Sequence, residues 1–174
     1  DVAGTSYWET LDLDRLAVLD AADLVIIGRD CNSGGVSTDT TEIAQWDSVQ
    51  TPIMLMSSYI AANNRWKWID SGSQDARRAY YDAQAVDPNH AIFTGVALDA
   101  NDVVPWYDPN VASGYSSFIN AADAGNGKVL AVRPDNGNIL VAEWAAGAAF
   151  YASSPNTPLD VRMFFNAGTQ EISS

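Results

Sequence analysis

Two short apolar segments constrain the fold more than any other feature of the sequence. Residues 24–28 and 53–56 are strand-sized, and polar residues bound both of them. A continuous apolar strand is typical of a sheet that is covered on both faces. Helical patterns follow each segment after short connections, which indicates right-handed crossover units. We therefore expect these two segments to lie parallel and side by side beneath helices.

The intervening patterns predict the other elements. Leucine and valine at mixed three-and-four spacing indicate a helix over residues 12–20, and residues 38–42 offer N-caps for a second helix whose buried stripe is Ile43, Ala44, Trp46 and Val49. A short helix follows Ser57. Partial alternation over residues 78–86 predicts a half-exposed strand. The turn at residues 134–137 predicts a β-hairpin between segments 128–133 and 138–144, and residues 161–165 form a last strand.

Composition excludes several classes of function. Nine basic against twenty-two acidic side chains give a formal net charge of −13, which disfavours nucleic acid as a partner. No apolar run reaches the ~18 to 20 residues of a membrane span. A single cysteine cannot form an internal disulfide. The acidic, lysine-poor composition is typical of proteins in salt water or outside the cell, so we expect an extracellular or cell-surface location.

The order of these segments resembles the glutamine-amidotransferase-like superfamily, and within it the ThuA-like group and related domains of secreted bacterial proteins. The resemblance spans roughly residues 12 to 170 and rests on segments 23–27, 51–59, 87–95 and 162–165, together with the hairpin. It implies an α/β fold, a flavodoxin-like three-layer sandwich with a mainly parallel sheet plus an antiparallel C-terminal hairpin. Residues 1–174 would form a single domain that lacks the family's first strand and helix and its last helix. Either the sequence is a fragment, or a neighbouring chain completes the sheet.

The loops that begin at Arg29 and Ser57 are the expected ligand site, because ligands bind beyond the carboxyl ends of the strands in open α/β sheets. Amidotransferase relatives carry a nucleophilic cysteine at the turn where this sequence has Ser57, and their catalytic histidine lies later in the chain, where this sequence has none. A serine needs a neighbouring base. A dyad of Ser57 with His90 is one reading; a helix-capping hydroxyl and a turn-fixing imidazole are the other. A hydrolase using Ser57 or Asp30 stays an alternative to a non-catalytic domain.

Cys31 and the acidic turns raise two further hypotheses. Arg29 beside Cys31 could lower the pKa of the thiol, yet no base accompanies Cys31 in the local sequence, and a structural thiol is the other reading. One histidine and one cysteine cannot supply a tetrahedral zinc site. The segment with Asp135, Asn136 and Asn138 and the segment of residues 99–102 each have two interpretations: an oxygen-ligand calcium site or an ordinary turn. We expect no cofactor.

The aromatic residues suggest a ligand class. Six tryptophans and seven tyrosines exceed what a core of this size requires, and exposed rings suit the faces of sugars. Trp66 and Trp68 alternate, so either could instead be core, as expected for Trp46 and Trp144. The predicted ligand-binding residues are Arg29, Asp30, Ser57, Tyr59, Arg65, Trp66 and Trp68.

The sequence thus predicts a non-catalytic binding or assembly domain of an extracellular bacterial protein, with carbohydrate as the expected ligand. The alternatives are a hydrolase and a structural subunit that a neighbouring chain completes.

Overall fold

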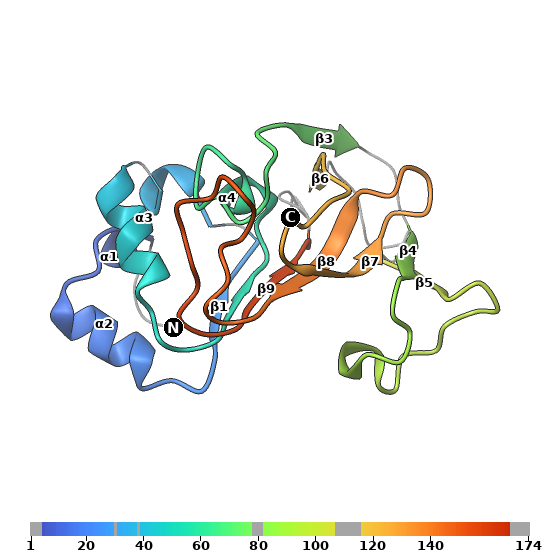
Figure 1. Cartoon of the computed structure of the whole chain (residues 1–174), viewed down its shortest axis with the longest axis horizontal. Coiled ribbons are helices and arrows are strands. Elements are labelled where there is room, and N and C mark those ends of the chain that lie inside the picture. Colours follow the sequence, from blue (N-terminus) through green and yellow to red (C-terminus); the bar gives the residue numbers. More distant parts are fainter. Residues whose placement is uncertain (1–4, 30, 38, 78–81, 107–115, 168–174) are drawn as a thin grey trace, which may run out of the picture.

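A seven-stranded mixed sheet is the main element of the computed structural model, which describes residues 5–29, 31–37, 39–77, 82–106 and 116–167 (Figure 1). The spatial order of its strands is β1-β2-β9-β8-β7-β4-β5, and β3 and β6 pair in a separate sheet. The strands are β1 (Val25–Ile27), β2 (Ile53–Leu55), β3 (Gln74–Arg77), β4 (Asp82–Ala85), β5 (Val103–Pro105), β6 (Ser116–Ile119), β7 (Lys128–Val132), β8 (Ile139–Trp144) and β9 (Arg162–Phe165).

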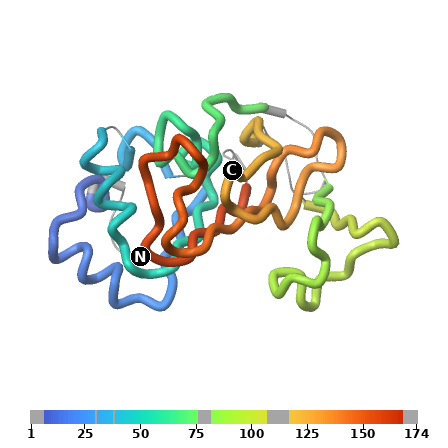
Figure 2. The backbone as a smooth tube through the Cα atoms, viewed as in Figure 1, coloured from blue at the N-terminus to red at the C-terminus, as the bar shows by residue number. Residues whose placement is uncertain are grey.

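The parallel half of the sheet consists of β1, β2 and β9. β1 pairs with β2 in parallel, which confirms the predicted adjacency of the two apolar segments, and β2 pairs with β9 in parallel. The predicted hairpin is also confirmed, because β7 pairs with β8 in antiparallel orientation. Figure 2 shows the red C-terminal segment running beside segments from the first third of the chain.

Four α-helices lie within the described residues, and acidic residues cap the two longest of them. They are α1 (Thr5–Trp8), α2 (Leu13–Asp20), α3 (Thr40–Asp47) and α4 (Ser58–Ala61), with 3-10 turns η1 (Ser33–Gly35) and η2 (Ala91–Phe93). The carboxylate of Asp12 accepts a hydrogen bond from the Arg15 amide, and that of Asp39 accepts bonds from the amides of Thr41 and Glu42. The two predicted helices that have these caps are therefore confirmed, and α4 confirms the short helix predicted after Ser57. Figure 1 shows the helices gathered near β1, at the opposite end of the sheet from β4 and β5.

The predicted flavodoxin-like three-layer sandwich is wrong. The protein is mostly sheet, and four of the six pairings in the large sheet are antiparallel within the described residues, so the sheet is not mainly parallel. The expectation that both faces of β1 are covered is also wrong, because the Ile26 side chain is 57% exposed while Val25 and Ile27 are buried. An all-apolar strand cannot reveal by itself that only one of its faces packs.

The core lies on both faces of the sheet. On the helical face, four tryptophans form a chain of ring contacts with centroids 5.0 to 6.0 Å apart: Trp46, Trp66, Trp68 and Trp144. The expected burial of Trp46 and Trp144 is confirmed. On the other face, Phe93, Val104 and Trp106 pack over β7, β8 and β9. Among the described helices, none has the length and apolar character needed to cross a membrane.

Candidate functional site

The carboxyl ends of the three parallel strands meet at one edge of the sheet, which we call the rim. β1 continues into Arg29, β2 into Ser57, and β9 into Asn166 and Ala167. The register confirms this arrangement, since Ile27, Leu55 and Phe164 lie in one row across the three strands. The rim is therefore where ligand-binding side chains from distant parts of the sequence can meet.

Ser57 lies at the rim but is not placed for nucleophilic catalysis. Its side chain is buried, and its hydroxyl has no hydrogen-bond partner among the described residues. Ser57 precedes α4 without a side-chain cap bond, so the predicted capping hydroxyl is wrong. A working serine nucleophile needs a base in hydrogen-bonding contact, and none of the described side chains provides one.

His90 is engaged elsewhere. Its Nδ1 accepts a hydrogen bond from the Ile92 amide at 3.3 Å, which confirms the expected turn-fixing imidazole. Its Nε2 lies 3.4 Å from a carboxylate oxygen of Glu143 on β8. Both ring nitrogens therefore have partners, and the structure does not bring His90 to Ser57. Asp30, the other catalytic alternative, lies outside the described residues.

The predicted ligand-binding residues after Ser57 do not share one surface. Trp66 and Trp68 are each only 1% exposed, and the Trp66 indole donates a hydrogen bond to the Val36 carbonyl at 2.8 Å. Their burial supports the core alternative, because a sugar cannot stack on a ring face packed inside the protein. Tyr59 is exposed and its hydroxyl lies 3.3 Å from that of Ser117. Arg65 donates to the Ser33 hydroxyl at 3.4 Å.

Arg29 borders a pocket of about 440 Å³, which we call the Arg29 pocket. Among the described residues that line this pocket, Arg29 alone is charged, and no described carboxylate pairs with its guanidinium. The other walls are apolar and come from η2, β5, β8, β9 and adjoining loops: Ile92, Phe93, Val96, Val104, Pro105, Trp106, Val141, Phe165 and Ala167. Such a pocket suits a ligand with an apolar body and one anionic group.

Trp106 is held against the wall of the Arg29 pocket. Its ring packs on Phe165 with centroids 4.8 Å apart, and its Nε1 donates a hydrogen bond to the Asn166 carbonyl at 2.9 Å. Trp106 is not among the predicted ligand-binding residues, because sixty residues separate it from its acceptor. In the sequence, the place of Trp106 next to Tyr107 in polar surroundings was the only signal.

A second, more polar pocket of about 660 Å³ shares no lining residue with the Arg29 pocket, and we call it the Asp70 pocket. Its lining includes two carboxylates, two amides, a phenol and a hydroxyl: Asp70, Asp123, Asn120, Asn126, Tyr151 and Ser153. Burial, together with the nearby Asp70 carboxylate, raises the pKa of the Tyr151 hydroxyl. Tyr151 therefore stays a neutral hydrogen-bond donor at physiological pH.

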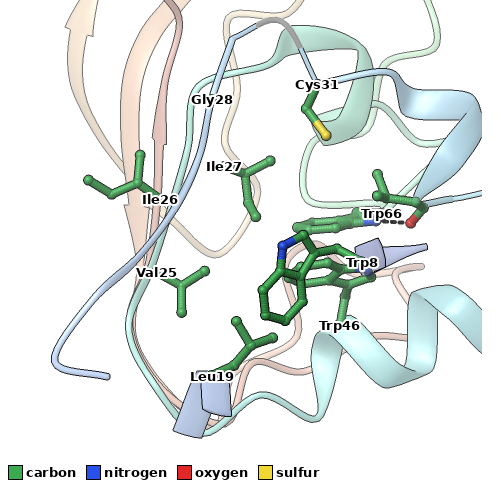
Figure 3. A pocket seen from close by; sticks show the side chains of 10 residues that line it. Trp8, Leu19, Val25, Ile26, Ile27, Gly28, Cys31, Trp46 and Trp66 are labelled. Carbon is green, nitrogen blue, oxygen red and sulfur yellow. Dashed lines mark hydrogen bonds between the residues drawn. The ribbon is translucent and has the colours of Figure 1, made fainter. Parts of the chain in front are cut away.

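A third pocket, the β1 pocket, has a volume of about 370 Å³ and lies between β1 and the first helices (Figure 3). Figure 3 shows Val25 and Ile27 pointing toward Trp8, Trp46 and Trp66, with the Cys31 thiol at one end. The sequence indicated Cys31 as a reactive or structural thiol, and the structure places it against an apolar wall.

The acidic turns have internal partners. The Asp135 carboxylate accepts two hydrogen bonds from the buried Arg133 guanidinium, at 2.6 and 3.0 Å. Asn136 accepts from the Asn138 amide, and the Asn138 side chain donates to Asn120. Asp99 accepts from two amides of its own turn, and these bonds lower the pKa of its carboxyl. The ordinary-turn alternative accounts for both candidate calcium segments.

Comparison with known proteins gives a likeness of fold. No family model matches the sequence, and no curated protein matches it. Cytoplasmic protein STM3548 from Salmonella typhimurium is similar in structure over 95% of this chain and 69% of its own, with 10% identity and a TM-score of 0.56. Cytoplasmic protein STM1381 from Salmonella typhimurium LT2 is similar over 98% and 70%, with 11% identity and a TM-score of 0.59.

These neighbours correct one expectation. Both are named as cytoplasmic proteins, which contradicts the predicted extracellular or cell-surface location, and we withdraw that prediction. An acidic, lysine-poor surface favours solubility and does not specify a compartment. The amidotransferase-like resemblance stays a prediction.

Proposed function

We propose that this protein is a non-catalytic binding domain whose ligand, an organic anion with an apolar body, occupies the Arg29 pocket. The proposal rests on the described lining of this pocket, which combines one guanidinium, paired with no described carboxylate, with apolar walls. A guanidinium can hold a carboxylate through two parallel hydrogen bonds, while Trp106 and Phe165 offer ring surface to the ligand body. The lack of contact between Ser57 and His90 favours binding over the hydrolase alternative.

The test compares a charged probe with a neutral one of the same shape. We expect 2-naphthoate to bind the protein and 2-naphthamide to bind more weakly in calorimetric titration. Arg29→Gln should weaken naphthoate binding by about 10- to 100-fold, because a hydrogen bond to a charged group contributes about 1.5 to 3 kcal/mol. The same variant should leave naphthamide binding unchanged.

Arg65→Gln is the matched control, because Arg65 lies outside the Arg29 pocket. If the Arg29 and Arg65 variants lost the same affinity for naphthoate, the overall charge of the protein would account for binding, and the proposal would fail. Naphthoate binding that survives Arg29→Gln intact would also refute it.

Carbohydrate stays a second candidate ligand, now for the Asp70 pocket. Its carboxylates, amides and phenol can bond the hydroxyls of a sugar, which the Arg29 pocket cannot do with one polar residue. A glycan array should then give a signal that Asp123→Ala abolishes and Trp106→Phe leaves unchanged. An array without signal for the unaltered protein would exclude this candidate.

A further inference from the structure

β1 is an edge strand with unused backbone hydrogen-bonding groups. It pairs with β2 alone among the described strands. The Val25 amide donates to the Pro52 carbonyl at 3.0 Å, and the Ile27 carbonyl accepts from the Met56 amide at 2.9 Å. Because alternate residues of a strand in a parallel pair face opposite neighbours, the N–H and C=O of Ile26 point to the open edge. That edge can form hydrogen bonds with one more strand.

The side chains beside this edge are apolar on both faces. Figure 3 shows Val25 and Ile27 directed toward the tryptophans and Ile26 directed the other way. Four consecutive residues, 25–28, line the β1 pocket, so the backbone of β1 forms one of its walls. On the opposite face, the Leu24 and Ile26 side chains are 46% and 57% exposed. An apolar edge of this kind is the usual template for strand addition.

An added strand would meet apolar surface on each face of the sheet. Successive side chains of a strand point to opposite faces, so one would enter the β1 pocket and the next would cover Ile26. Trp8, Trp46 and Trp66 line the pocket and favour an aromatic side chain there. The edge therefore has the features of a peptide site that reads alternate side chains.

Charge determines which kind of partner fits. Asp23 is exposed two residues before β1, and the whole chain carries a formal net charge of −13. The net charge of the whole chain disfavours a second copy as the occupant, whereas a basic residue of another protein would face Asp23.

We propose that the open edge of β1 binds an extended segment of another protein by strand addition, with an aromatic side chain in the β1 pocket and a basic residue near Asp23. This site is separate from the Arg29 pocket and does not depend on the proposed anion binding. Hydrogen bonds to the Ile26 backbone would provide affinity, and the tryptophan-lined pocket would provide specificity.

The test uses a blocked nine-residue peptide with Val at alternate positions, Phe at the centre, Thr between them and Lys at each end. Amide hydrogen exchange by NMR should show fast exchange at Ile26 and slow exchange at Ile27 in the free protein. Peptide should slow exchange at Ile26 by at least about tenfold, since a hydrogen-bonded amide exchanges only when the bond opens. A control peptide with N-methylated amides on its pairing side cannot form these hydrogen bonds and should leave the exchange rate at Ile26 unchanged.

Ile26→Pro removes the outward N–H and should weaken peptide binding about tenfold or more, while Ile26→Val keeps it and should bind as the unaltered protein does. If Ile26→Pro does not fold, the effect of the peptide on amide exchange at Ile26 in the unaltered protein tests the proposal instead. The proposal fails if the peptide does not bind, or if it binds without protecting Ile26. It also fails if Ile26 is already protected and light scattering shows a dimer, which would make a second copy the occupant.

Discussion

Asp47, the last residue of α3, should make the stability of this protein fall as the pH rises. Burial raises the pKa of its carboxyl from 3.8 to about 7, against the smaller opposing effect of the Arg162 guanidinium. A group whose folded-state pKa is raised holds a proton in the folded state that the unfolded chain has already lost. Stability therefore falls between about pH 4 and pH 7 and is constant above that range.

The magnitude follows from the two pKa values. A difference of about three pKa units corresponds to at most about 4 kcal/mol, at 1.36 kcal/mol per unit. Asp47→Asn keeps the shape of the side chain and cannot ionise. The variant should match the unaltered protein near pH 4 and should exceed its unfolding free energy by up to about 4 kcal/mol at pH 8.

Urea unfolding followed by tryptophan fluorescence at pH 4, 5, 6, 7 and 8 measures this difference. Ser48→Ala, a change at the same helix end, introduces and removes no titratable group, so its effect should be the same at every pH. A constant difference between Asp47→Asn and the unaltered protein across this range would refute the burial of an uncompensated carboxylate.

Three further changes test two packed positions of the core and one exposed ion pair. Gly127→Ala should cost about 1 to 3 kcal/mol in urea unfolding, because a Cβ there would lie 2.4 Å from Nε1 of Trp144 and 2.8 Å from a backbone oxygen. Trp68→Ala should cost about 3 to 5 kcal/mol by the same measurement, since it leaves a cavity among stacked rings. Asp87→Asn removes an exposed ion pair with Lys128 and should leave the thermal unfolding midpoint unchanged, because surface pairs contribute little.

Local signals explain which elements the sequence predicts correctly. Asp12 and Asp39 cap their own helices, and the turn at residues 134–137 joins strands that are neighbours in the chain, so a short window contains the physical cause. The pairing of β3 with β6 joins Gln74 to Ile119, and no local pattern indicates such a partner. The predicted fold class was wrong for the same reason, because pairings between strands that are distant in the sequence determine whether a sheet is mainly parallel or mainly antiparallel.

The candidate site was predictable only in part. The rule that ligands bind beyond the carboxyl ends of strands located Arg29 correctly at the rim. The burial of Trp66 was not predictable, because its indole reaches the Val36 carbonyl thirty residues away. Arg133 and Arg162 are fully buried although charged side chains are usually exposed, and each has one acceptor in a distant segment, the Asp75 carboxylate and the Val49 carbonyl respectively.

The central position of β9 has a consequence for folding during synthesis. β9 lies between β2 and β8, and it joins the parallel half of the sheet to the antiparallel half. The Arg162 guanidinium also donates to the carbonyls of Val49 and Thr51, which ties β9 to the segment before β2. The ribosome must therefore have released β9 before the two halves can join, and until then the nascent chain exposes two unpaired inner edges that chaperones could recognise.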